Sequence, residues 1–394
     1  MSTCNICEAR HMAPVYVSPE NVSITSLTEI RSGRTEVFAC AQCGHLQTTP
    51  LPDLDAYYDE QYRILIDSED EDQLYKIVDG EKIFRVRHQV DTLLEKIELP
   101  TGASVLDFGC AKGASARRLA RCRPDLKLHL FDISRMYLPF WQKFSEPDRW
   151  GTHDVPAHWH GKFDAVFSMY VAEHVAAPVA FARQIASLLK PGGTLYWLIP
   201  DVAANPADFI VADHVNHFSE HSLAALMEKA GLNLRTIDSR SHEAGLIAIA
   251  DTRTTKSNFR PSSSLARWQS DVRGIASLWS GLGSRIRQFE TQRPANEPSA
   301  IYGSGFYGTY IASCLSSLDN VRCFVDRNPF RQGHSLLGKP IIDPCELEES
   351  IQTVYVGLNP LTARQNIGDV DAWHDRDLSL CFLNDDDSAI RSAA

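Results

Sequence analysis

The segment 105–113, Val-Leu-Asp-Phe-Gly-Cys-Ala-Lys-Gly, constrains the fold of this chain more than any other stretch. An apolar strand ends at Asp107, and a turn bounded by Gly109 and Gly113 then opens a helical segment. Glycine lets the backbone approach a ligand closely, and the first N–H groups of a helix are free to bind it. The next strand ends at Asp132, where a carboxylate can accept both ribose hydroxyls of an adenosine ligand. The pattern therefore predicts an adenosine-binding turn at the edge of a parallel sheet.

Short apolar strands alternate with longer helical segments through residues 103–250. The expected strands are 104–109, 128–133, 163–169 and 193–200, and the expected helices are 115–122, 180–190 and 222–231. Alternation at this spacing predicts an α/β domain with a doubly wound parallel sheet. Residues 299–394 restart the alternation, which predicts a second, smaller α/β domain. Apolar residues at spacings of three and four predict one further helix over residues 83–97.

Composition restricts the classes of function. The 394 residues carry 39 basic and 50 acidic side chains, a formal charge of −11. This balance argues against binding to nucleic acid or to an anionic membrane, because both depend on clustered Lys and Arg. No apolar run reaches 18 residues, and the N-terminal stretch has no apolar core of a secretion signal. Ten cysteines in such a chain do not indicate a disulfide framework, so we expect a reducing cytoplasm.

Four cysteines occur as two matching pairs at the start of the chain: Cys4, Cys7, Cys40 and Cys43. Each pair closes a tight turn, and four thiolates complete the tetrahedral shell of a structural zinc ion. The alternatives are four free thiols or two redox pairs. His11 and His45 lie nearby in the sequence but are not needed as ligands. We therefore predict a zinc-binding module over residues 1–56, followed by a helical substrate-side segment (57–100), the main α/β domain (101–250), a helical connector (251–298) and the second α/β domain (299–394).

The reacting groups are expected where strands of the main domain end, because ligands of open α/β sheets bind outside the carboxyl ends of the strands. Tyr170, Glu173 and His174 follow the strand 163–169, and the pair Asp213–His214 lies between the strand 193–200 and the next helix. Histidine titrates near neutral pH and can take a proton there. The alternative is that these residues cap a helix or bind the backbone, and Ser219 is itself the expected N-cap of the helix that follows.

The order of motifs resembles that of class I S-adenosylmethionine (SAM) methyltransferases. The glycine turn corresponds to their motif I, Asp132 to the acidic residue of strand 2, and the Lys-Pro-Gly-Gly turn at 190–193 to the turn before strand 5. The alternative, a NAD-binding Rossmann unit, does not predict this last turn. The resemblance implies a SAM site formed by these residues: Asp107, Gly109, Ala111, Gly113, Asp132, Asp154 and Met169.

Over nearly the full chain, the sequence also resembles bacterial C-methyltransferases of nucleotide-linked deoxysugars. Those enzymes combine a four-cysteine zinc module, a Tyr-containing helical segment, a SAM domain and a C-terminal Rossmann-like domain. A histidine base of that family removes the proton beside a 4-keto group, and the resemblance assigns this role to His214, with Asp213 beside it. His174, Tyr170 and Asn216 are the expected donors to the enolate. The family's tyrosine is replaced by Val211, which removes a phenol.

The second glycine-rich turn, Gly303-Ser-Gly-Phe-Tyr-Gly308, follows an expected strand and opens an expected helix. It predicts either a dinucleotide site or a scaffold that lines the nucleotide-sugar pocket, and the resemblance favours the scaffold. The sequence thus predicts a SAM-dependent methyltransferase that acts on a small molecule, a nucleotide-linked sugar. The alternatives are O- or N-methylation of another metabolite, and an inactive SAM-fold protein with a binding or assembly role.

Overall fold

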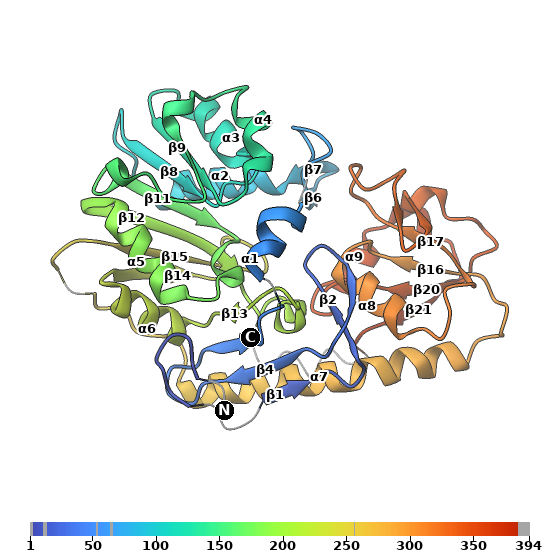
Figure 1. Cartoon of the computed structure of the whole chain (residues 1–394). Helices are drawn as coiled ribbons and strands as arrows, with labels where there is room; N and C mark the ends of the chain where they lie inside the picture. Colours follow the sequence, from blue (N-terminus) through green and yellow to red (C-terminus); the bar gives the residue numbers. More distant parts are fainter. Residues whose placement is uncertain (1–2, 11–13, 53, 64–65, 256, 385–394) are drawn as a thin grey trace. The chain divides into compact units, whose positions relative to one another are not determined.

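The computed structural model describes residues 3–10, 14–52, 54–63, 66–255 and 257–384. The chain forms two compact units (Figure 1). The first comprises residues 1–14, 38–202 and 213–269, and the second comprises residues 15–37, 203–212 and 270–394. Among the described residues, no helix combines the length and the apolar composition that crossing a membrane requires.

A seven-stranded sheet forms the centre of the first unit. Its strands lie in the order β10 (Trp150–Thr152), β9 (Lys127–Asp132), β8 (Ser104–Phe108), β11 (Phe163–Met169), β12 (Leu189–Pro200), β15 (Gly245–Asp251) and β14 (Asn233–Asp238). The five strands from β10 to β12 are parallel, as the sequence predicts. β15 and β14 are antiparallel additions at one edge, and neither they nor β10 is among the predicted strands.

Helices cover both faces of this sheet (Figure 1). One face packs against α2 (Arg85–Lys96) and α3 (Ala114–Cys122), and the other packs against α5 (Pro178–Leu188) and α6 (Glu220–Ala230). Alternate residues of each strand point to opposite faces: Val105 contributes to the first core and Leu106 to the second. Burial on both faces explains why the central strands are continuously apolar.

Local sequence sets the ends of these helices. Ser219 is the N-cap of α6, as predicted: its hydroxyl accepts a hydrogen bond from Ser222 N, and Ser222 Oγ accepts one from Ser219 N. α2 begins at Arg85, two residues later than the apolar spacing suggests. Ile83 belongs instead to β7 (Glu81–Phe84), which pairs with β6 (Leu74–Val78) in a hairpin.

Shorter elements connect the main ones. In the first unit these are β5 (Leu46–Thr48), α1 (Leu54–Ala56), the π-helical turn η1 (Tyr57–Gln61), η2 (Arg135–Tyr137), α4 (Leu138–Trp141), η3 (Pro147–Arg149), η4 (Ala157–Trp159), η5 (Ala172–His174) and β13 (Asn216–His217). β1 (Pro14–Val17), β4 (Glu36–Ala39) and α7 (Leu265–Thr291) include residues of both units. α7 is a single helix within the predicted helical connector.

The second unit contains a six-stranded sheet in the order β18 (Ser335–Leu336), β19 (Lys339–Ile342), β17 (Val321–Val325), β16 (Ser299–Tyr302), β20 (Thr353–Val356) and β21 (Ser379–Phe382). All pairs except β18–β19 are parallel. Its other elements are β2 (Val22–Ile24), β3 (Ile30–Ser32), η6 (Pro206–Ile210), α8 (Phe306–Cys314), η7 (Pro344–Glu346), α9 (Ala363–Gly368) and η8 (Asp371–Trp373). The predicted glycine turn joins β16 to α8. A Cβ atom at Gly308 would lie 1.9 Å from Gly303 O, so this close approach requires glycine.

Candidate active site

The turn after β8 has the geometry that its glycines predict. Gly109 adopts a left-handed φ of 83°, and a Cβ atom there would lie 2.4 Å from Val171 Cγ2. The N–H groups of Gly109 and Cys110 donate to Phe131 O at 2.8 and 3.0 Å, which joins the turn to the end of β9. Gly113, with a φ of 72°, precedes the first residue of α3. The amides at the start of α3 therefore face the edge of the sheet where β8 and β9 end.

Asp132 lies at the end of β9 and is bonded to this turn. One carboxylate oxygen accepts from Ala111 N at 2.8 Å, and the other accepts from Ser134 N at 3.0 Å. Burial raises the pKa of Asp132 to about 6, although these backbone donors favour its charged form. The carboxylate keeps further lone pairs for a ligand, since each oxygen can accept more than one hydrogen bond.

Asp107 is the second buried acid beside the turn. Its Oδ2 has no hydrogen-bond partner within the described part of the chain. Burial raises the pKa of Asp107 well above its usual range, and the nearby charge of Asp132 raises it further. A buried acceptor without a partner is costly, so this position suits a ligand that brings a donor or a positive charge. The two other predicted cofactor residues lie at the same edge: Met169 ends β11, and the exposed Asp154 follows β10.

Lys112 points away from the turn. Its Nζ donates to the carbonyl oxygens of Ser68 and Glu71 at 2.8 and 2.6 Å. Arg117 on α3 binds the same segment through Glu69 Oε2, at 2.9 Å. These contacts fasten the acidic segment 68–72 over the turn, and they keep the ammonium group of Lys112 directed at backbone oxygens rather than at a ligand.

A cluster of polar side chains lies near the ends of β11 and β12. Tyr58 Oη is 2.5 Å from His174 Nδ1, 2.9 Å from Asp213 O and 3.2 Å from Asp213 Oδ2. His174 and His214 form an edge-to-face ring pair, with centroids 4.7 Å apart. We call Tyr58, His174, Asp213 and His214 the proton-transfer cluster. Three of its members are residues predicted from the sequence, and Tyr58 is an addition from η1.

Relatives with known names match this part of the chain. A family model described as a methyltransferase domain matches residues 81–237. A ubiquinone biosynthesis O-methyltransferase of Xanthomonas campestris pv. campestris is 31% identical over 176 residues, which cover 39% of this chain and 72% of that protein. The protein of that name from Xanthomonas axonopodis pv. citri is also 31% identical, with 36% and 68% covered. This chain belongs to the SAM-dependent methyltransferases.

A solved structure of a putative methyltransferase from Bacillus halodurans C-125 is 16% identical, with a TM-score of 0.34, and the match covers 42% of this chain and 99% of that one.

The residues around the turn fit SAM. The buried acceptor Asp107 Oδ2 suits the donors of a cationic ligand, and the ionised Asp132 suits the ribose hydroxyls. Gly109 lets the turn lie directly against Val171, where a Cβ atom would clash.

Replacing Asp132 by Asn should weaken SAM binding about tenfold or more. The substitution removes a charged acceptor, and hydrogen bonds to charged groups contribute about 1.5–3 kcal/mol, while 1.4 kcal/mol corresponds to one decade of affinity. Titration calorimetry with SAM measures this change, and Asp319→Asn serves as a control on an exposed carboxylate of the second unit. Equal SAM affinity in the wild type and Asp132→Asn would show that Asp132 is not the ribose ligand.

The affinity for SAM should also fall as the pH drops below about 6, because Asp132 then takes up a proton. The effect of the Asp132 ionisation on folding stability has the opposite sign. The pKa of Asp132 is higher in the folded chain than the value of about 3.9 in unfolded chains, so its ionisation reduces folding stability as the pH rises from about 4 to 6. Asp132→Asn should remove both effects, which separates them from the titration of Asp107. Calorimetry at pH 5 and 7.5 tests this, and a flat wild-type profile would contradict it.

The four cysteines gather as predicted. Cys4 Sγ is 3.7 Å from Cys43 Sγ, Cys7 Sγ is 3.4 Å from Cys40 Sγ, and all four sulfur atoms lie within 4.8 Å of one another. Four thiolates around one zinc ion at about 2.3 Å are separated by about 3.8 Å. The set therefore fits a closed structural zinc site. His11 lies outside the described residues, and His45 Nε2 is 3.2 Å from Asn216 Oδ1.

This four-cysteine cluster is linked directly to the loop that carries His214. β5, which follows Cys43, pairs with β13, so that Leu46 faces His217 and Gln47 faces Asn216. Thr48 N donates to Val215 O at 3.0 Å, and Thr48 Oγ1 is 2.8 Å from His217 Nε2. The segment that follows the four cysteines therefore holds the loop that carries His214 in position.

Two predicted donors have other partners. The side-chain amide of Asn216 donates to Ala172 O and Val175 O at 2.9 and 2.7 Å, so both of its hydrogens are taken by the backbone and the prediction that Asn216 donates to the enolate is wrong. Tyr170 Oη lies 3.4 Å from His242 Nδ1. The phenol that reaches His174 is that of Tyr58 instead.

Tyr58 was missed because its contacts join residues that are 116 and 155 positions apart. The only sequence signal was the group of three tyrosines at positions 57, 58 and 62. Glu173, His174 and His214 also place ligand atoms within 4.8 Å of one another, the types that bind divalent metals.

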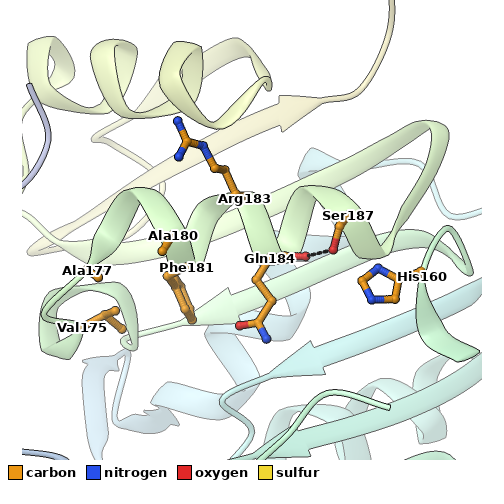
Figure 2. A pocket seen from close by; sticks show the side chains of 8 residues that line it. All are labelled: His160, Val175, Ala177, Ala180, Phe181, Arg183, Gln184 and Ser187. Atoms are coloured by element: carbon orange, nitrogen blue, oxygen red, sulfur yellow. Dashed lines mark hydrogen bonds between the residues drawn. The ribbon is translucent and has the colours of Figure 1, made fainter. Parts of the chain in front are cut away.

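A surface groove follows α5 (Figure 2). It is lined by Val175, Ala177, Ala180, Phe181, Arg183, Gln184, Ser187 and His160. Within α5, Ser187 Oγ donates to Gln184 O at 2.6 Å (Figure 2). None of the residues of the cofactor turn or of the proton-transfer cluster lines this groove, so it is separate from the candidate active site.

Proposed function

We propose that this methyltransferase methylates a carbon atom next to a carbonyl group in a keto-deoxysugar carried on a nucleotide. The observation that supports it most is the proton-transfer cluster. It places two imidazoles, a phenol and a buried carboxylate at the sheet edge that also holds the cofactor turn. When bound, SAM supplies a methyl group on a cationic sulfur. The protein must therefore generate the nucleophile.

His214 is the base in this proposal. It takes the proton from the carbon beside the carbonyl, and the electron pair of that C–H bond becomes an enolate. Asp213 is fully buried, and its contacts are with Tyr58 and His174, at 3.2 and 3.8 Å. The carboxylate therefore holds Tyr58 and His174 in position, and His174 is the donor to the enolate oxygen, where a positioned hydrogen bond stabilises developing charge. Burial, with the charge of Asp213, raises the pKa of Tyr58, so its phenol stays protonated and donates to Asp213.

The nucleotide-sugar acceptor is supported by the order of parts along the chain. The chain has the same order of parts as the sugar C-methyltransferases that it resembles. These parts are a four-cysteine cluster, a tyrosine-containing turn, a SAM unit and a second glycine-turn unit. Tyr58 also supplies a phenol to the cluster, although Val211 replaces the tyrosine expected after β12.

O-methylation is the second candidate, because the relatives with 31% identity are named ubiquinone biosynthesis O-methyltransferases. In that case His214 would take the proton of a hydroxyl group.

The purified chain should be incubated with SAM carrying a ¹³C-methyl group, with keto-deoxysugar nucleotides and with catechol-type acceptors. Nuclear magnetic resonance of the product shows whether the label is bonded to carbon or oxygen. C-methylated sugar supports the proposal, and O-methylated catechol alone overturns it.

Replacing Tyr58 by Phe should lower turnover about tenfold or more. The variant keeps the ring contacts with Tyr57, Tyr62 and His174, at 4.9–5.1 Å between centroids, and removes only the hydroxyl that binds His174 and Asp213. The affinity for SAM should not change, because the phenol does not touch the cofactor turn. Steady-state kinetics with saturating SAM measures the loss, with Tyr355→Phe in the second unit as a control. Wild-type turnover by Tyr58→Phe would remove Tyr58 from the mechanism.

A further inference from the structure

Arg85 is a cation without an anionic partner. It is the first residue of α2, it is half-buried, and its guanidinium lies over the ring of Tyr170, 5.2 Å from the centroid. Across the described residues it forms no ion pair or side-chain hydrogen bond, and its Nε is buried without a partner. Other arginines of this unit are paired: Arg117 with Glu69, Arg123 with Asp125, and Arg235 with Asp251.

The groups around Arg85 do not neutralise it. Asp72 interacts electrostatically with Arg85 but forms no ion pair with it, and its two oxygens accept from Gln73 N at 2.7 Å and Val86 N at 3.1 Å. Burial lowers the pKa of His242 to about 4, so this imidazole is neutral at pH 7 and its Nε2 has no partner in the described chain. The surroundings thus hold a planar, five-donor cation with its donors unused.

The position of Arg85 places these donors on the acceptor side. Tyr170, whose ring lies against the guanidinium of Arg85, directly follows the carboxyl end of β11 and has a left-handed φ of 58°. Backbone strain of this kind is concentrated at functional sites. His174 of the proton-transfer cluster is only four residues further along the chain. The stack on Tyr170 fixes the plane of the guanidinium, which suits two-pronged binding of an oxyanion.

We propose that Arg85 binds an anionic oxygen group of the methyl acceptor, a phosphate or a carboxylate. The inference rests on the proposed function only in that the acceptor binds at this edge of the sheet, and it does not depend on which atom is methylated. A phosphate would come from a nucleotide carrier, and a carboxylate from a free acid. Arg85 acts as a specificity-determining residue, because a half-buried unpaired guanidinium favours charged acceptors over neutral ones.

The test measures anion binding without turnover. The full chain, saturated with S-adenosylhomocysteine, is titrated by calorimetry with inorganic pyrophosphate and, separately, with acetate. The wild type should bind at least one of them. Arg85→Met should lower that affinity about tenfold or more, Arg85→Lys should lower it less, and Arg87→Met should bind like the wild type. Arg87 is exposed and paired with Glu81, so it controls for general surface charge.

The preferred anion distinguishes the two sources: tighter binding of pyrophosphate indicates a nucleotide carrier, and tighter binding of acetate a carboxylic acid. Equal affinities in wild type and Arg85→Met, or no anion binding by the wild type, would overturn the proposal. Affinity for S-adenosylhomocysteine and circular dichroism should be unchanged in Arg85→Met, which excludes misfolding as the cause of a loss. A failure of C-methylation in the product analysis would leave this result intact, so the two proposals fail separately.

Discussion

Replacing His214 by Gln is expected to lower turnover by about 10²–10⁴-fold, the usual contribution of a positioned base. Glutamine keeps a polar side chain of similar length but cannot take up a proton. His214 is buried, and its ring lies against His174, 4.7 Å away, so a change there acts on the acceptor side of the site. The affinity for SAM should stay within about twofold, because His214 is not part of the turn after β8.

Steady-state kinetics and calorimetry on the same preparation measure these two quantities. His334→Gln is the matched control, since His334 is exposed in the second unit. His174→Gln should also lose turnover, because it breaks the contact with Tyr58 Oη at 2.5 Å. Near-wild-type turnover by His214→Gln would exclude His214 as the base and point to His174.

Replacing Cys40 by Ser is expected to remove zinc and, with it, most of the activity. The wild type should contain about one zinc ion per chain, and the loss of one thiolate opens a closed four-ligand site. Structural zinc contributes directly to folding free energy, so the melting temperature should also fall. Activity should fall together with the zinc content because β5 pairs with β13, and β13 begins two residues after His214. A zinc ion enclosed by four thiolates would have no open coordination position for methyl transfer.

Metal analysis, thermal unfolding and turnover should change together in Cys40→Ser. Cys122→Ser is the control, because Cys122 is exposed on α3 and distant in sequence from the four-cysteine cluster. Full zinc content together with wild-type stability in Cys40→Ser would show that the four sulfur atoms do not form a metal site.

The sequence predicts those features that depend on local patterns. The strand–turn–helix at 105–113 is visible because its glycines and the buried strand are adjacent in the chain. The paired spacing of Cys4, Cys7, Cys40 and Cys43 predicts a shared metal ion, and the structure brings their sulfur atoms together. The parallel order of the central strands follows from the alternation of strands and helices. The five-part division of the chain stays a prediction.

Features that depend on distant pairing were not predictable in this way. Tyr58 reaches His174 and Asp213 from more than 100 residues away, and no local spacing signals that contact. Asn216 lies in the expected loop, but its pairing with β5 turns its amide toward the backbone of η5. β15 and β14 form an antiparallel edge because β15 returns beside β12, a choice that strand composition alone does not specify.

The most direct test of the central claim, that the proton-transfer cluster generates a carbon nucleophile, is hydrogen exchange at the acceptor. A keto-deoxysugar nucleotide is incubated in D₂O with the protein and S-adenosylhomocysteine, so that no methyl transfer occurs, and the loss of the hydrogen beside the carbonyl is followed by nuclear magnetic resonance. We predict rapid exchange with the wild type and a loss of about 10²-fold or more with His214→Gln. Exchange that is absent in the wild type, or that is equally fast in His214→Gln, would contradict the account.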